Sequence, residues 1–215
     1  GDNGISSVTV NGVAATGGTA SGSGTANWSR SALPLIAGPN TITVVAKDNS
    51  ANQNQRTVQI TVNYDPTAPV AGVVTPSNTQ FLSFVDSPFD LATSFTDNES
   101  AVTGCEYTIN GGTNWLAAAF SGSLPNFTCT QTGITGTNGQ VLTLNMRATS
   151  SGGTGTALAV TRTVDTAAPT TTNNAPAGWV AVDQTVTLTP SDGSGSGVAS
   201  TQYCTDASNS CTPAT

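Results

Sequence analysis

Histidine is absent from this chain of 215 residues, and charged side chains of both signs are scarce. Without imidazole, the chain lacks the commonest general base, the Ser-His-Asp and Cys-His nucleophile systems, and the histidine ligands of zinc and haem. Its 5 basic residues stand singly against 12 acidic ones, so no cluster of positive charge could neutralise a run of phosphates. No apolar run approaches the roughly 20 residues that cross a bilayer as a helix. These absences argue against an enzyme, a nucleic-acid-binding protein and a membrane-inserted protein.

Residues that favour helices are also few, whereas Thr, Ser, Gly, Asn and Val dominate the composition. Such a composition favours strands that are joined by turns. Apolar residues make up 36% of the chain and charged residues 8%, which differs from the highly charged, core-poor composition of disordered proteins. The sequence therefore predicts an all-β fold with little or no helix.

An acidic turn phrase occurs three times, and its aspartates Asp2, Asp97 and Asp192 are spaced 95 residues apart. Each aspartate is followed by a turn rich in Gly, Asn or Ser, and then by an apolar residue that begins a strand pattern. The three phrases are GDNGISSVTVNG from Gly1, TDNESAVTGCEYTING from Thr96 and SDGSGSGVASTQYCTD from Ser191.

A second repeat places a hairpin directly before a seam that contains proline. Residues 40–64 and 140–164 each hold two alternating strands around a polar loop, which is typical of an antiparallel hairpin. The seams that follow are YDPTAPV at 64–70 and VDTAAPT at 164–170. Because proline cannot donate a hydrogen bond to a central ladder, these seams mark unit boundaries. We predict the C-terminal part of a domain at 1–64, a complete domain at 65–164 and the N-terminal part of a domain at 165–215.

The central unit has room for seven or eight short strands, about the number in an immunoglobulin-like sandwich. The strands are expected near residues 70–74, 79–85, 88–95, 102–109, 114–120, 126–131, 141–148 and 156–163. The outer units carry only parts of this pattern, so we expect the chain to be a fragment of a longer protein. The alternative is that residues 165–215 of one chain complete the unit begun by residues 1–64 of the next. Against it, both ends carry the strand that follows the acidic turn.

These phrases resemble those of bacterial immunoglobulin-like domains, which occur in tandem in large adhesins, surface-layer and sheath proteins, and as spacers in secreted carbohydrate-active enzymes. The resemblance rests on ISSVTVNG at 5–12, the turn at 38–40 that leads into NTITVVAKDNSAN, the two seams, and GCEYTINGGTNW at 104–115. It implies tandem immunoglobulin-like β-sandwich domains, the first and last incomplete, in a secreted or cell-surface bacterial protein.

The four cysteines fall in two pairs, Cys105 with Cys129 and Cys204 with Cys211. Pairing within each unit closes short loops and predicts two disulfides, which form in an oxidising compartment and fit export from the cell. A zinc site made of all four thiolates would instead need ligands from two units at irregular spacing. We expect the disulfides.

The acidic turns and seams are candidates for calcium, because this cation takes several oxygen ligands from carboxylates, amides and carbonyls. Asp97, Asn98 and Glu99 stand in one turn, and Asp65 and Asp165 stand at the seams. Seam calcium would stiffen a row of domains. The alternative is that these side chains only cap turns by hydrogen bonding to nearby backbone groups.

Two further alternatives come from carboxylates and from tryptophans. Paired carboxylates of the kind found in glycosidases could be drawn from the acidic residues of the central unit, Asp86, Asp90, Asp97, Glu99 and Glu106. Trp28, Trp115 and Trp179 could stack on sugar rings. Buried tryptophan is, however, a usual anchor of a sandwich core. Because Trp28 and Trp115 lie at comparable places in their units, we expect core positions.

The function expected from this sequence is structural and non-enzymatic: a spacer, a stalk or a fibre-forming segment of a large bacterial extracellular protein. Its partners would be adjacent domains of the same polypeptide or neighbours in a filament. The first alternative is an adhesive module that binds a glycan, a filament or another surface protein. The second is a set of accessory domains of a secreted carbohydrate-active enzyme. Short seams with proline predict an elongated, semi-rigid rod.

Overall fold

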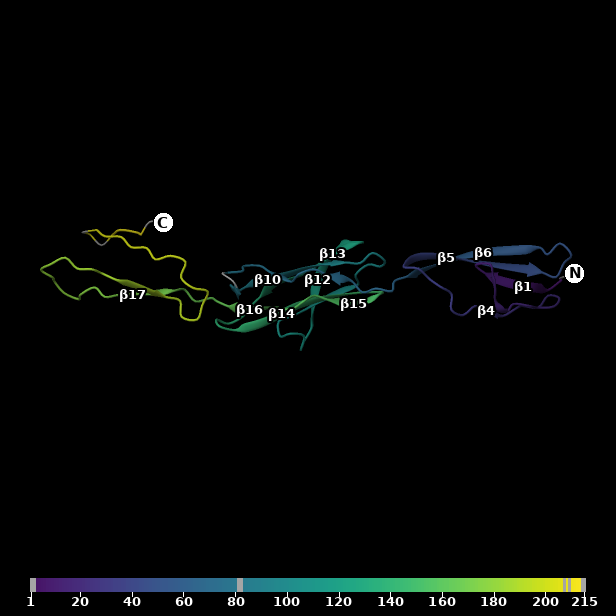
Figure 1. Ribbon diagram of the computed structural model, residues 1–215, viewed down its shortest axis with the longest axis horizontal. Helices are drawn as coiled ribbons and strands as arrows, with labels where there is room; N and C mark the ends of the chain where they lie inside the picture. Colours follow the sequence, from purple (N-terminus) through teal and green to yellow (C-terminus); the bar gives the residue numbers. More distant parts are fainter. Residues whose placement is uncertain (1–2, 81–82, 207, 209, 214–215) are drawn as a thin grey trace.

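The computed structural model describes residues 3–80, 83–206, 208 and 210–213, so Asp2 of the first acidic turn lies outside the described residues. All regular structure in the described part of the chain is β, which confirms the predicted all-β class. With no helix there, none is long and apolar enough to cross a membrane. Figure 1 shows three groups of strands in a row, with the two termini at opposite ends of an elongated molecule.

The N-terminal segment, residues 3–64, contains a four-stranded antiparallel sheet. Its order is β2 (Val13–Ala14), β1 (Ile5–Val10), β5 (Gly38–Asp48) and β6 (Gln55–Tyr64). The hairpin predicted at 40–64 is β5 and β6, which pair with Ile42 opposite Ile60. Between β2 and β5, β3 (Thr16–Gly17) pairs with β4 (Trp28–Ser29).

The central segment, residues 65–164, forms one continuous path of hydrogen-bonded strands, β7-β10-β13-β12-β11-β14-β16-β9, with β15 on β14 and β8 on β10. The bounds are β7 (Val70–Ala71), β8 (Thr75–Pro76), β9 (Phe84–Val85), β10 (Phe89–Thr96), β11 (Gly104–Thr108), β12 (Leu116–Ser123), β13 (Asn126–Ile134), β14 (Val141–Ser150), β15 (Gly153–Thr156) and β16 (Val160–Val164). The strands expected at 70–74 and 79–85 are much shorter than predicted. The one expected at 156–163 is replaced by β15 and β16. These sheets are consistent with a β-sandwich.

The buried core lies in the central segment. Strands β10 and β14 alternate buried and exposed residues, as expected for strands with one face in a core. The largest fully buried side chains there include Phe89, Leu91 and Phe95 on β10 and Leu144 and Met146 on β14. In the N-terminal segment, Val8 and Val10 are the fully buried hydrophobic residues. The hydrophobic contacts of this fold are therefore concentrated between residues 74 and 164.

The C-terminal segment, from residue 165 onward, contains a two-stranded sheet of β17 (Thr170–Asn173) and β18 (Leu188–Ser191). Nearly all of its described side chains are exposed, and Trp179 is fully exposed. The expectation of a core position is also wrong for Trp28, which is 41% exposed. Neither tryptophan has the large buried cluster that surrounds the central strands, because the apolar faces of the outer segments lack a covering layer.

Trp115 is the half-buried tryptophan, at the start of the hairpin between β11 and β12. The guanidinium of Arg147 lies over its ring, 4.3 Å from the ring centre, and also forms an ion pair with Glu106. This cation–π contact occupies one face of the indole, which is then not free to stack on a sugar ring.

Candidate functional site

Asp65 connects the N-terminal segment to two loops of the central segment. It directly follows β6, and its Oδ1 accepts a hydrogen bond of 3.1 Å from the Thr67 amide. Its Oδ2 accepts hydrogen bonds from the hydroxyls of Ser100, in the acidic turn, and Ser150, at the end of β14. The Ser100 hydroxyl in turn accepts a hydrogen bond from the Ser151 amide. One carboxylate therefore ties the linker to both loops.

Glycines let the linker lie directly against the β14–β15 turn. A Cβ atom at Gly152 would collide with the carbonyl oxygen of Thr67 and with Oδ1 of Asp65, and one at Gly155 would collide with the carbonyl oxygen of Pro69. The seam sequence and the GGTG turn are thus matched in shape. We call residues 65–69, the turn at 97–100 and the turn at 150–153 the first joint.

Gly152→Ala is expected to open the first joint without unfolding the central core. The added methyl group would displace Thr67 and Asp65, and a lost hydrogen bond to a charged group costs about 1.5–3 kcal/mol. Hydrogen exchange at the Thr67 amide should therefore become at least about tenfold faster. The matched control is Gly104→Ala, because a Cβ at Gly104 would meet no atom within 4 Å. Equal exchange in both variants would contradict this account of the joint.

The first joint also gathers three carboxylates. Single oxygen atoms of Asp65, Asp97 and Glu99 all lie within 4.8 Å of one another. Asp97 is only 3% exposed, and its Oδ1 accepts hydrogen bonds of 3.0 Å from the amides of Glu99 and Ser100. Its Oδ2 is buried and has no hydrogen-bond partner. A buried carboxylate oxygen without a donor is costly, so this atom points to a missing positive partner.

Asp65 is ionised at neutral pH. The hydrogen bond from the Ser100 hydroxyl is the main reason that the pKa of Asp65 lies below its ordinary value of 3.8, and the amides of Thr67 and Gly152 and the Ser150 hydroxyl act in the same direction. Partial burial opposes them and is the weaker influence overall. A cation at this joint would therefore meet a charged carboxylate at every pH above the ordinary range of aspartate.

The second joint repeats this arrangement around Asp165, which is also 3% exposed. Its Oδ1 accepts a hydrogen bond of 3.2 Å from the Ala167 amide and its Oδ2 one from the Ser196 amide, which is the main cause of a lowered pKa of Asp165. A Cβ at Gly195 would lie within 3 Å of carboxylate oxygens of both Asp165 and Asp192. Oδ1 of Asp192 is again buried without a hydrogen-bond partner. This joint differs in bringing together two carboxylates rather than three.

The other acidic residues considered from the sequence do different jobs. Asn98 is exposed and lies outside the carboxylate cluster. Asp90 accepts a hydrogen bond of 2.8 Å from the Gly133 amide, Asp86 one of 2.7 Å from the Ser87 amide, and Glu106 pairs with Arg147 at 2.6 Å. Each of these three carboxylates holds a local turn or strand pair.

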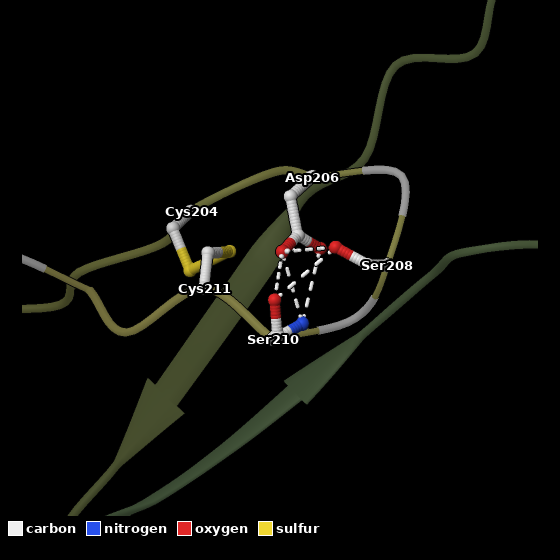
Figure 2. The surroundings of a disulfide bond; sticks show 5 residues. All are labelled: Cys204, Asp206, Ser208, Ser210 and Cys211. Carbon is white, nitrogen blue, oxygen red and sulfur yellow. Dashed lines mark hydrogen bonds between the residues drawn. A yellow bond between two sulfur atoms is a disulfide. The ribbon is translucent and has the colours of Figure 1, made fainter.

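The cysteines form two disulfides, Cys105 with Cys129 and Cys204 with Cys211, and none of the four is free. The first joins β11 to β13 within the buried core. The second closes a small loop of the C-terminal segment, where Asp206 accepts hydrogen bonds from Ser208 and Ser210 (Figure 2). Disulfides of this kind are formed in an oxidising environment.

Sequence reasoning found the seam aspartates and the acidic turns but missed the serines and glycines that complete the joints. A signal for them was present, since Ser100 and Ser196 follow the turn aspartates Asp97 and Asp192 by three and four residues. Comparison of the chain with protein-family models found no match, and neither did comparison with curated proteins.

Proposed function

We propose that this chain is a spacer or stalk segment of a large bacterial extracellular protein, built from tandem immunoglobulin-like domains of which the first and last are incomplete. The observation that carries the proposal is the pair of similar joints, in which a seam aspartate ties the linker to the acidic turn that follows. Such joints limit bending between neighbouring groups of strands. The extended row of strand groups in Figure 1 and the two disulfides also support it.

We further propose that the first joint binds a calcium ion. The donors fit a hard cation, because they are carboxylate oxygens from Asp65, Asp97 and Glu99, and the carbonyl oxygen of Thr67 lies beside Asp65 next to Gly152. Three carboxylates this close repel one another unless a cation offsets their charge. The buried Oδ2 of Asp97 would gain the partner that it lacks. Asn98 and Asp165 are not needed for this site.

Calcium is expected to stabilise the chain and to stiffen the first joint. At about 100 times the dissociation constant, binding to the folded state alone adds about 2.7 kcal/mol to the free energy of unfolding. Titration calorimetry would measure binding, and small-angle scattering would compare the maximum dimension with calcium and with a chelator. Asp97→Asn should lose both effects, whereas Asp90→Asn, a carboxylate of the same segment outside the cluster, should keep them.

Two results would count against these proposals, and they are separable. No heat of binding and no change in unfolding on adding calcium would remove the metal from the joint but leave the spacer. A compact particle in solution, with a maximum dimension far below that of the extended row, would contradict the spacer itself.

A further inference from the structure

The N-terminal sheet has an uncovered apolar face. Strands β5 and β6 place alternate apolar residues on one side, where Val58 and Ile60 are 50% and 48% exposed and Tyr64 is also exposed. Strand β6 is an edge of its sheet, and its 10 residues have no second partner strand in the described part of the chain. A long edge strand beside exposed apolar side chains is a surface on which another strand can pair.

The central segment shows what covers the corresponding face there. The hairpin region 140–164 repeats residues 40–64, and its last strand β16 pairs in parallel with β9, with Val164 opposite Val85. The segment from β7 to β10 also supplies Phe89, Leu91 and Phe95 to the core. Residues 70–96 are therefore the cover of this hairpin, and the N-terminal sheet has no equivalent.

The C-terminal segment carries a second copy of that cover. Residues 85–91 read VDSPFDL and residues 182–188 read VDQTVTL, which agree at the Val-Asp pair and at the final Leu, with an apolar residue two places before it. Strand β17 pairs with β18 just as β7 pairs with β10, directly before the acidic turn. Yet Val182 is 70% exposed and Val186 is also exposed. This cover segment has no core to complete within its own chain.

We propose that residues 170–191 of one copy of this chain dock on the exposed β5–β6 face of a second copy, head to tail. The two surfaces of one molecule lie at opposite ends of the row, with the central segment between them, so they cannot meet within a chain (Figure 1). The occupant is a second copy because the docking segment is the same repeat that covers the central hairpin. Repetition of this contact joins chains into a fibre, since a heterologous contact does not close on itself unless its rotation permits.

The charges of the two ends support this pairing. Three of the five basic residues, Arg30, Lys47 and Arg56, lie in residues 1–64, against Asp2 and Asp48, a net charge of +1. Residues 165–215 contain four aspartates and no basic residue, a net charge of −4. Opposite net charges favour encounter between unlike ends over encounter between like ends.

The strand that follows the acidic turn does not prevent this docking. In the N-terminal sheet that strand is β1, which already pairs with β5. Its counterpart near residues 198–203 forms no strand in the described residues, where the structure from residue 192 to 206 is turn and irregular. Docking needs only residues up to 191, so the second copy of the strand stays outside the contact.

The test uses the full chain and two surface variants in sedimentation velocity across a wide concentration range. Wild type should grow from the 21.4 kDa monomer to linear oligomers as concentration rises. Ile60→Asp removes the acceptor face and Val186→Asp removes the docking segment, so each variant alone should associate at least about tenfold more weakly. Mixed together, they should form a one-to-one dimer, because each retains the half that the other has lost. Leu158→Asp, an 87% exposed site in the central segment, is the control that should still oligomerise.

Three outcomes would overturn the proposal. Wild type that stays monomeric throughout would assign the exposed face to another segment of a longer polypeptide. Oligomers that persist in Val186→Asp would indicate that two β5–β6 faces stack on each other. Variants that remain monomeric when mixed, although circular dichroism shows both to be folded, would contradict the complementary pairing.

Discussion

Leu142→Ala is expected to lower the free energy of unfolding of the central segment by about 2–5 kcal/mol, the largest effect of a single substitution considered for this chain. Leu142 is 2% exposed on β14 and packs in the buried cluster. Truncation removes its apolar contacts and leaves a cavity that surrounding strands cannot fully close. Urea unfolding followed by Trp115 fluorescence, with Trp28 and Trp179 replaced by Phe, would measure the change in this segment alone.

The matched control is Ile42→Ala, which removes the same number of atoms one hundred residues earlier in the repeat. Ile42 is only half-buried, because the face of β5 lacks a cover. Its truncation should cost about 1 kcal/mol or less, since partly exposed side chains lose less burial. Equal costs at the two positions would show that the N-terminal sheet is covered in solution, which would also bear on the proposed docking.

Reduction of the disulfide between Cys105 and Cys129 is expected to lower the stability of the central segment by about 3 kcal/mol. The two cysteines are 24 residues apart, and releasing a loop of that length restores conformational entropy to the unfolded chain. Unfolding with and without a reductant, followed by Trp115 fluorescence, would measure the loss.

A chain with Cys204→Ala and Cys211→Ala serves as the control, because it keeps only the central disulfide. The full effect of the reductant should persist in it, since the second disulfide closes a loop of only 7 residues in a different segment. An unchanged unfolding curve on reduction would mean that the central disulfide constrains residues already held together in the unfolded state.

The sequence supported prediction of strands wherever alternation was strong. Strands β5, β6, β10 and β14 follow runs in which Val, Ile, Leu or Phe alternates with Thr and other polar residues, and the structure pairs them as hairpins or core strands. Short strands were less predictable. Residues 70–76 hold β7 and β8 only because β10 offers a pairing edge on that side, and edge pairing is a property of the whole sheet.

The joint was half predictable for a similar reason. Asp65, Asp97 and Glu99 could be singled out because acidic residues recur beside turns, but their proximity depends on the path of the linker across the turn at 150–153. Ser150 lies 85 residues from Asp65 in the sequence. Trp28 misled for the opposite reason: its place in the repeat matched Trp115, but repeat position does not specify whether a covering segment is present.

The central disulfide has a consequence for the length of the chain under tension. If a pulling force unfolded the central segment, the residues between Cys105 and Cys129 would stay closed in a loop and would not lengthen the thread. At about 3.5 Å for each extended residue, that loop withholds roughly 80 Å of contour. A stalk of this build would therefore yield by a shorter, redox-dependent step, and a reductant in the surroundings would set how far it stretches before it breaks.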